Sequence, residues 1–167
     1  YAYQGYLAGI WPPGKSDLGT AMTVIRHLLQ GHATAYDVIH ERQPEARVGF
    51  AHNMQVFDPS RPGSPADRLV TSLIDRAYNR AILTALVKGI WTPPLGFGLA
   101  RDLRDTLDWI GLNYYTRELV AFDRAASDEF FSRRFHAEDA EMLDGGYGES
   151  YPQGILRCLN RLAKLDL

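Results

Sequence analysis

The sequence predicts an α/β protein in which short buried strands alternate with amphipathic helices. The clearest strand covers residues 108–117, because apolar side chains occupy every second position from Ile110 to Tyr114. Two longer stretches, 17–39 and 66–87, repeat their apolar residues at helical spacing instead. A second short strand at 47–53 separates these two helices.

Composition places the chain among ordinary globular proteins. Its 167 residues suit one domain, with 46% hydrophobic and 23% charged residues. A net charge of −2, with no basic run that carries interleaved aromatics, argues against a nucleic-acid partner. No apolar run approaches the roughly 18 residues of a membrane span, so no membrane association is expected. The single cysteine, Cys158, excludes an internal disulfide and fits a reducing compartment, and we expect a cytoplasmic location.

The first fifty residues predict a structured loop and a long helix. Residues 1–14 are rich in aromatics and glycine, which indicates a packed aromatic cluster. Asp17 can cap the helix that follows, and Pro44 ends it. The apolar positions that define this helix are Ala21, Val24, Ile25, Leu28, Leu29, Ala35, Val38 and Ile39.

The middle of the chain predicts a strand, a loop and a second helix. The strand at 47–53 ends in Asn53, and prolines and glycine make 58–65 an irregular loop. The helix at 66–87 carries one apolar stripe, and the proline-containing segment 89–98 leads to the next strand. That stripe consists of Leu69, Leu73, Ile74, Ala77, Ala81 and Leu86.

The strand at 108–117 ends in polar groups. Asn113 and Tyr115 lie two residues apart and therefore point to the same side. An amide and a phenol at the end of a strand can bind sugar hydroxyls or orient a carboxylate. The alternative is a strand that simply runs into a polar turn.

After Arg117 the chain is expected to be irregular until a last helix starts near Pro152. The expected buried stripe of that helix is Ile155, Leu156, Leu159 and Leu162.

No group of side chains has the spacing of a metal site. His27 and His32 lie five residues apart, which is poor geometry for one helical face, and a zinc pair is more often four apart. We therefore interpret His32 as a hydrogen-bonded packing residue. Cys158 lies in an apolar helical pattern, which favours a packed thiol over a nucleophile.

One motif is specific enough to indicate a family. Residues 108–116 read Asp-Trp-Ile-Gly-Leu-Asn-Tyr-Tyr-Thr, which resembles the sixth barrel strand of glycoside hydrolase family 1, the β-glucosidases and their relatives. Further segments resemble the same family in the same order. They are the Gly-Tyr and Pro-Pro-Gly segment at 5–14, the Leu-Leu and His-Ala helix around His32, the fifth strand at 48–53, and Tyr-Pro-x-Gly at 151–154.

The resemblance implies a partial (β/α)8 TIM barrel. Residues 1–167 would be the central part of a single glycosidase domain, with strands 5 and 6, helices 4 to 6 and long βα loops. Both flanks would be missing. His52 stands where the family commonly has an apolar residue, and it could either reach the sugar site or pack. The family's tryptophan before Tyr151 has no counterpart between Tyr147 and Ser150.

A retaining glycosidase needs two carboxylates about 5–5.5 Å apart. The family carries them in Thr-x-Asn-Glu-Pro and Thr-Glu-Asn-Gly, and neither motif occurs in this sequence. Tyr1 falls just after the first motif and Leu167 just before the second, so no catalytic residue is expected in the chain. Glu118 and Glu149 match no catalytic position, and we expect both to be solvated.

The site residues that the resemblance assigns are supporting ones. Tyr115 matches the tyrosine that hydrogen-bonds and orients the nucleophile. Asn53 and Asn113 match asparagines that line the substrate site. Neither a metal nor an organic cofactor is implied, and the expected ligand is a β-linked glycoside.

The implied parent is a β-glucosidase-like retaining glycosidase, and the chain alone is expected to be inactive. The missing barrel segments could act as partners of the chain. An alternative from another class is a non-catalytic sugar-binding or scaffold protein with a degenerate family 1 barrel.

Overall fold

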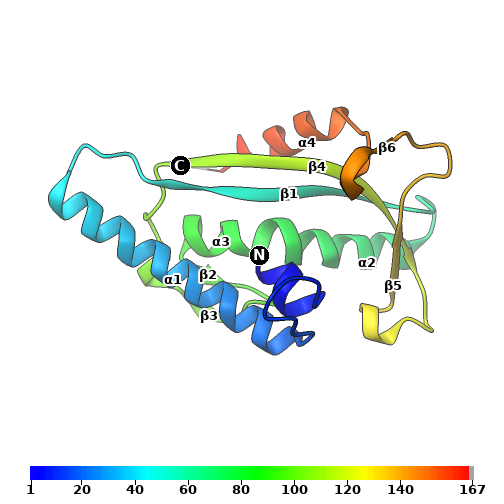
Figure 1. The fold of residues 1–167 in the computed structure, drawn as a ribbon, viewed down its shortest axis with the longest axis horizontal. Helices are drawn as coiled ribbons and strands as arrows, with labels where there is room; N and C mark the ends of the chain where they lie inside the picture. The colour runs from blue at the N-terminus through cyan, green and yellow to red at the C-terminus, as the bar shows by residue number, and fades with distance from the viewer. Residues whose placement is uncertain (166–167) are drawn as a thin grey trace. The chain divides into compact units, whose positions relative to one another are not determined.

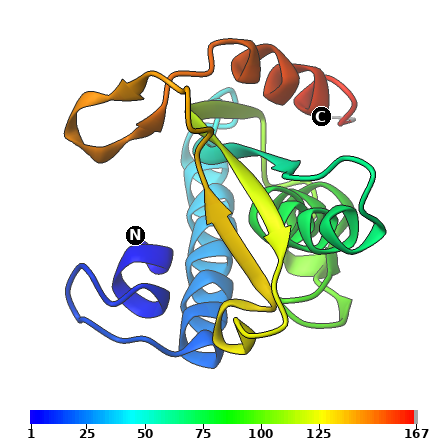
Figure 2. The ribbon, with the colours of Figure 1, turned by 90° about the vertical axis from the view of Figure 1, so that its right-hand side faces the viewer.

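The structure, a computed structural model, describes residues 1–165, and Asp166 and Leu167 lie outside the described residues. Its contacts divide the chain into two compact units. The first unit contains Tyr1–Gly49 and Ala81–Trp109, and the second contains residues 50–80 and 110–165. Figures 1 and 2 show the elements of each unit.

The first unit is built on the long helix α1 (Leu18–Arg42), which starts and ends as the sequence predicts. The Asp17 carboxylate caps it by accepting a hydrogen bond of 2.6 Å from the Thr20 N–H. None of the helices described in residues 1–165 is both long and apolar enough to cross a membrane. The other elements of the unit are helical turns at Tyr3–Leu7 and Arg101–Leu103, helix α3 (Ala81–Lys88), and the paired strands β2 (Ile90–Trp91) and β3 (Gly98–Leu99).

Asp108, the first residue of the Asp-Trp-Ile-Gly-Leu-Asn-Tyr-Tyr-Thr motif, is structural. Its carboxylate accepts hydrogen bonds from the Val48 N–H at 2.7 Å and from the Tyr36 hydroxyl at 2.9 Å. These bonds hold the pKa of the Asp108 carboxyl below its usual value. The His32 Nε2 lies 2.7 Å from the Thr106 carbonyl oxygen, which confirms His32 as a hydrogen-bonded packing residue. The segments that precede the two long strands are thereby tied to α1.

The second unit contains most of the two predicted strands, β1 (Gly49–Pro59) and β4 (Trp109–Phe122), whose first residues belong to the first unit. The expectation that the first strand ends at Asn53 is wrong, because β1 continues to Pro59, into the segment expected to be an irregular loop. They are neighbours in a sheet of order β1-β4-β5. The Asp108 N–H donates to the Val48 carbonyl and the Ser60 N–H to the Val120 carbonyl, so the two strands run in the same direction. This confirms a parallel strand pair of the α/β kind.

The remaining elements of the second unit surround this sheet. Strand β5 (Ser132–Phe135) pairs with the end of β4 in antiparallel register. The others are helix α2 (Pro65–Asp75), turns at Arg76–Arg80, Ser127–Glu129 and Asp144–Gly146, the pair β6 (Met142–Leu143) and β7 (Gly148–Glu149), and helix α4 (Gln153–Leu162).

Helix α4 packs on one face of β1 and β4, and it lies along these strands in Figure 1. The core of this contact consists of Met54, Val56 and Cys158, with Leu112, Tyr114, Tyr151 and Leu162 against it. Gly154 permits the close approach, because a Cβ there would lie 1.9 Å from the Tyr114 hydroxyl oxygen. That hydroxyl donates to the Tyr151 carbonyl at 2.8 Å, and burial raises the pKa of Tyr114 to about 12.

The helix expected at 66–87 forms as α2 and α3, joined by a π-helical turn at Arg76–Arg80. This turn carries Asn79, whose side chain is fully buried. The Asn79 amide nitrogen donates to the Gln55 carbonyl at 2.8 Å, and its amide oxygen accepts from the Gln55 N–H at 3.0 Å. The turn therefore pairs an amide side chain with the backbone of β1. π-Helical turns inside α-helices often occur at positions with such a specific role.

The expectation of irregular chain after Arg117 is wrong for its first part. β4 continues to Phe122, because β5 pairs with it from Leu119 to Phe122. Its second half also packs inward, where Val120 joins Phe57 and Val70 in a second core. Sequence periodicity missed this extension because its buried partners come from residues far away along the chain.

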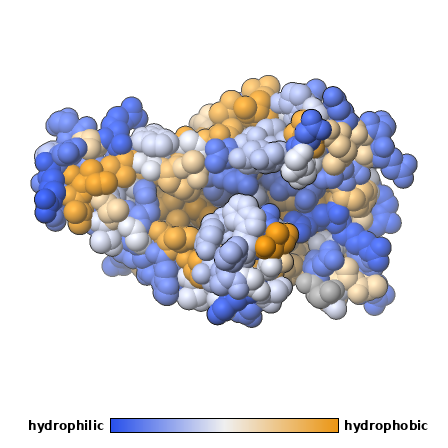
Figure 3. Space-filling view, viewed as in Figure 1, coloured by the Kyte–Doolittle hydropathy of each residue, from blue (hydrophilic) through white to orange (hydrophobic). Residues whose placement is uncertain are grey.

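The expected inward stripes of the helices are partly wrong. Ile155, Leu156 and Leu159 are exposed, and α4 turns Gly154 and Cys158 inward instead. The close contact of Gly154 with Tyr114 fixes this rotation of the helix. Figure 3 shows the resulting apolar surface over α4. Leu28, Val38 and Ile39 of α1 and Leu69 and Leu73 of α2 are likewise exposed.

Candidate functional site

The two faces of β4 differ in character. Leu112 and Tyr114 pack under α4, so strand alternation points Asn113 and Tyr115 to the opposite face. Both are exposed, Tyr115 to 46%. A large aromatic phenol and an amide are therefore free to meet a ligand on that face of the sheet.

Asn53 of β1 lies on the same face by the same argument. Its neighbour Met54 packs under α4, and Asn53 itself is exposed. Its amide nitrogen donates to the Tyr78 hydroxyl at 2.9 Å. The other side of the amide, its carbonyl oxygen, can accept a further hydrogen bond. The sequence thus predicted three polar residues that the fold gathers on one face of two neighbouring strands.

His52 belongs to the packing and not to this face. It is buried, and its Nε2 lies 3.2 Å from the Asn79 carbonyl oxygen. Burial lowers the pKa of His52, so the neutral imidazole is favoured. Of the two roles considered for His52, the structure supports packing.

Tyr147 is a further residue at this site, and sequence reasoning missed it. Its ring stacks on that of Tyr115, with centroids 5.4 Å apart and planes 15° from parallel. The only available signal was an aromatic residue in the glycine-rich segment before Tyr151. That signal is weak, because exposed aromatics in loops usually have no fixed partner.

Glu149 was expected to be solvated, and this is wrong. The residue is 1% exposed. Its Oε1 accepts from Arg117 Nε at 2.5 Å, and its Oε2 accepts from the Ala137 N–H at 3.0 Å. The Arg117 guanidinium also lies 4.2 Å from the centre of the Tyr151 ring. Glu149 is thus a buried structural anchor between β4 and the segment that carries Tyr147, since a buried carboxylate needs such partners.

The same network reaches β1 and α4 through Asp58. Arg157 of α4 binds the Asp58 carboxylate with both of its terminal nitrogens, at 2.8 and 2.6 Å. Hydrogen bonds from Arg157 hold the pKa of Asp58 below its usual value. Arg117 lies 3.8 Å from the same carboxylate. These ion pairs fix the ends of the two strands relative to α4.

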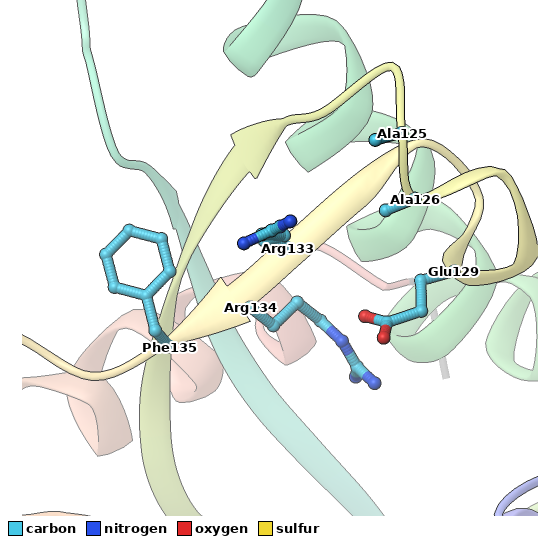
Figure 4. Close-up of a pocket in the computed structure, with 6 residues that line it drawn as sticks. All are labelled: Ala125, Ala126, Glu129, Arg133, Arg134 and Phe135. Carbon is cyan, nitrogen blue, oxygen red and sulfur yellow. The ribbon is translucent and has the colours of Figure 1, made fainter.

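Glu118 is not solvated either. Its side chain is half-buried and its Oε2 lies 3.5 Å from Arg134 Nη1. Arg134 lines a hollow at the end of β5 together with Ala125, Ala126, Glu129, Arg133 and Phe135 (Figure 4). The other arginine of this hollow, Arg133, pairs with Asp123. None of the three predicted site residues lines the hollow, so it is separate from the polar face of the sheet.

The described residues 1–165 contain no group of three or more His, Cys, Asp or Glu side chains that could hold a metal ion. Cys158 is fully buried in the core under α4, and burial raises the pKa of its thiol. This confirms Cys158 as a packed thiol.

Comparison with known proteins identifies the family. The family model described as glycosyl hydrolase family 1 matches residues 1–164. The chain therefore belongs to glycosyl hydrolase family 1, as the motif at 108–116 indicated.

Two curated relatives illustrate the range of the family. β-Glucosidase A of Thermotoga maritima is 28% identical over 96% of this chain and 38% of its own length. A β-galactosidase of Sulfolobus acidocaldarius is 34% identical over 90% of this chain and 27% of its own length. The chain thus spans well under half of the length of these relatives.

Solved structures agree on the fold. The β-glycosidase from Pyrococcus horikoshii superposes with a TM-score of 0.85 at 27% identity, over 99% of this chain and 37% of that protein. The family 1 β-glucosidase from Thermotoga maritima superposes with a TM-score of 0.84 at 25% identity, over 98% and 38%. The chain accordingly has the fold of part of a family 1 TIM barrel.

Proposed function

We propose that the chain is the central part of a retaining β-glycosidase of the β-glucosidase type. In this proposal β1 and β4 are the fifth and sixth barrel strands, and α1, α2 with α3, and α4 are the fourth to sixth helices. The observation that carries the proposal is the exposed polar face of Asn53, Asn113 and Tyr115 on two parallel strands of a family 1 chain. In a (β/α)8 barrel, the residues that form the active site come from several different strands and meet at one face of the barrel.

The chemistry requires a carboxylic acid that protonates the leaving oxygen and a carboxylate that attacks the anomeric carbon. In our proposal flanking segments of the parent supply both groups. The Tyr115 hydroxyl donates a hydrogen bond to the nucleophile, which orients it and stabilises its charged form. Asn53 and Asn113 hydrogen-bond the sugar hydroxyls or brace the carboxylates. This reaction needs neither a metal nor a cofactor.

The proposed substrate is a β-linked glycoside. The relatives' names include β-glucosidase, β-galactosidase and 6-phospho-β-galactosidase, which share a β-linkage and differ in the sugar. The Thermotoga maritima β-glucosidase has been solved with glucoimidazole and with deoxynojirimycin. An aryl β-glucoside is therefore the first substrate to test.

The test compares the full-length gene product with residues 1–167 alone, both assayed with an aryl β-glucoside. We expect the full-length protein to release the phenol, with retention at the anomeric carbon seen by NMR. The chain alone should show no turnover. A full-length protein that binds the sugar without turnover would instead favour the non-catalytic binder. Mixing the chain with the two flanking segments tests whether a split barrel can assemble.

The isolated chain is also expected to aggregate. Two barrel strands cannot close a barrel, and apolar side chains on α1, α2 and α4 are exposed. Analytical ultracentrifugation and thermal melting check this expectation. A monomeric preparation that melts cooperatively would contradict it.

A further inference from the structure

Three consecutive residues before α4 contact three consecutive residues of β4. Tyr147 stacks on Tyr115, as described above. The next residue along, Gly148, packs on Thr116. After it, Glu149 binds Arg117. The segment is thus matched to the strand residue by residue, and each contact is of a different kind.

Gly148 makes the approach possible. Its φ of +96° suits glycine, and a Cβ at this position would lie 2.5 Å from the Thr116 Oγ1. The Thr116 hydroxyl donates to the Glu149 carbonyl at 3.0 Å, and this contact is buried. The buried Glu149–Arg117 ion pair then fixes the end of the segment. The backbone on which Tyr147 stands is therefore held against β4 from its C-terminal side.

The two stacked rings differ from this anchored backbone because both are exposed, Tyr115 to 46% and Tyr147 to 57%. An exposed tyrosine on a strand has more than one accessible rotamer. Stacking between aromatic side chains contributes about 0.5–1.5 kcal/mol beyond burial, which is enough to favour one ring position several-fold. The ring of Tyr115 is thus held by a side chain whose own backbone is fixed.

We propose that Tyr147 is a positioning residue that holds the Tyr115 hydroxyl in place for the nucleophile. This inference rests on the proposed function, in which Tyr115 hydrogen-bonds the catalytic carboxylate. A hydrogen-bonding group at a catalytic site must be held within about 0.5 Å of its working position. Tyr147 acts through Tyr115 and makes no contact with the reacting atoms.

The experiment uses the full-length protein and compares Tyr147→Ala with Tyr147→Phe, which keeps the ring. Tyr115→Phe and the double variant Tyr115→Phe/Tyr147→Ala complete the cycle. Met142→Ala is the matched control, because Met142 is exposed in the same segment and does not stack on Tyr115. The readouts are kcat, KM, the pH dependence of kcat/KM and the melting temperature.

We expect Tyr147→Ala to lower kcat about three- to tenfold with little change in KM, in line with the energy of the stack. The acidic limb of the pH profile should move to higher pH, as it should in Tyr115→Phe, because a less well-bonded carboxylate ionises less readily. Tyr147→Phe and Met142→Ala should match the wild type. The double variant should lose no more activity than Tyr115→Phe alone.

Two results would overturn the inference. One is a double variant whose loss of activity equals the sum of the two single losses, together with a raised KM for bulky aglycones in Tyr147→Ala. Tyr147 would then contact the substrate directly. The other is an unchanged kcat and pH profile in Tyr147→Ala. If Tyr147→Ala lowers the melting temperature, Tyr147→Leu gives the same test with a bulky side chain and no ring. An inactive wild-type protein would refute the proposed function itself. If the wild type is active and Tyr115→Phe leaves kcat and the pH profile unchanged, the proposed function stands. The role of Tyr115 and the inference about Tyr147 are then refuted.

Discussion

Two adjacent tyrosines on β4 have opposite surroundings. Tyr114 lies under α4, touches Gly154 and donates its hydroxyl to the Tyr151 carbonyl. Tyr115 is exposed on the other face and stacks on Tyr147. The alternation of a strand thus separates a residue that serves stability from one that is available for binding. Substitutions on the two faces should therefore change different measured quantities.

The largest expected effect is a loss of activity, caused by a substitution on the exposed face. Asn113→Ala in the full-length protein should lower kcat/KM about a hundredfold, as loss of one well-placed hydrogen-bonding group at a catalytic site typically does. Because Asn113 is exposed, the melting temperature should stay close to that of the wild type. Steady-state kinetics and thermal melting measure both. A lowered melting temperature with unchanged activity would reverse the assignment of the two faces.

On the packed face the expected effect is on stability. Gly154→Ala places a Cβ 1.9 Å from the Tyr114 hydroxyl oxygen, so α4 or the ring must move. We expect a loss of about 1–3 kcal/mol in the free energy of unfolding of the full-length protein, the usual cost of overpacking. Denaturant unfolding measures it. The matched control is Gly63→Ala, because a Cβ at the exposed Gly63 meets no atom within 4 Å. Equal losses in both variants would contradict the role of the Gly154 contact.

The comparison also shows which features the sequence can predict. Period-two alternation correctly predicted the strand at 108–117 and the shared face of Asn113 and Tyr115, because alternation is a local property of a strand. Asn53 came from the family resemblance, and its strand was predicted to end at Asn53 but runs to Pro59. The expectation that Glu149 is solvated failed, since a glutamate in a glycine-rich segment gives no local sign of Arg117, 32 positions away. Helical spacing failed to predict the buried side of α4, because the rotation of that helix depends on one contact between Gly154 and Tyr114. The missed features all depend on contacts between distant residues.

Acid should destabilise the second unit through two ion-paired carboxylates, those of Asp67 and Asp58. The fully buried Asp67 binds Arg61 with both oxygens and accepts from the Phe122 N–H, and the Arg61 hydrogen bonds hold its pKa far below the usual value. The pKa of Asp58 is lowered by Arg157. Groups with a depressed folded-state pKa add stability that is complete above the unfolded value of about 3.9 and is lost as pH falls below it.

The full-length protein should therefore lose stability as the pH is lowered below about 4, the ordinary aspartate pKa. Asp67→Asn should lower stability at neutral pH and flatten this dependence, because the amide does not titrate. Denaturant midpoints from pH 7 down to the acid limit measure the effect. An unchanged slope below pH 4 in Asp67→Asn would show that other carboxylates dominate acid unfolding.

The smallest effect separates a glycine that is required from one that is not. Gly31 is exposed in the middle of α1, and a Cβ there meets no atom within 4 Å, in contrast to Gly154 in α4. Glycine inside a helix costs about 0.5–1 kcal/mol relative to alanine, because it loses more backbone freedom on folding. Gly31→Ala should therefore stabilise the full-length protein by about that amount and leave kcat/KM unchanged. Replacement of a helical glycine by alanine should thus raise the free energy of unfolding at Gly31 and lower it at Gly154. If both variants shift the denaturant midpoint in the same direction, packing against Tyr114 is not what distinguishes Gly154.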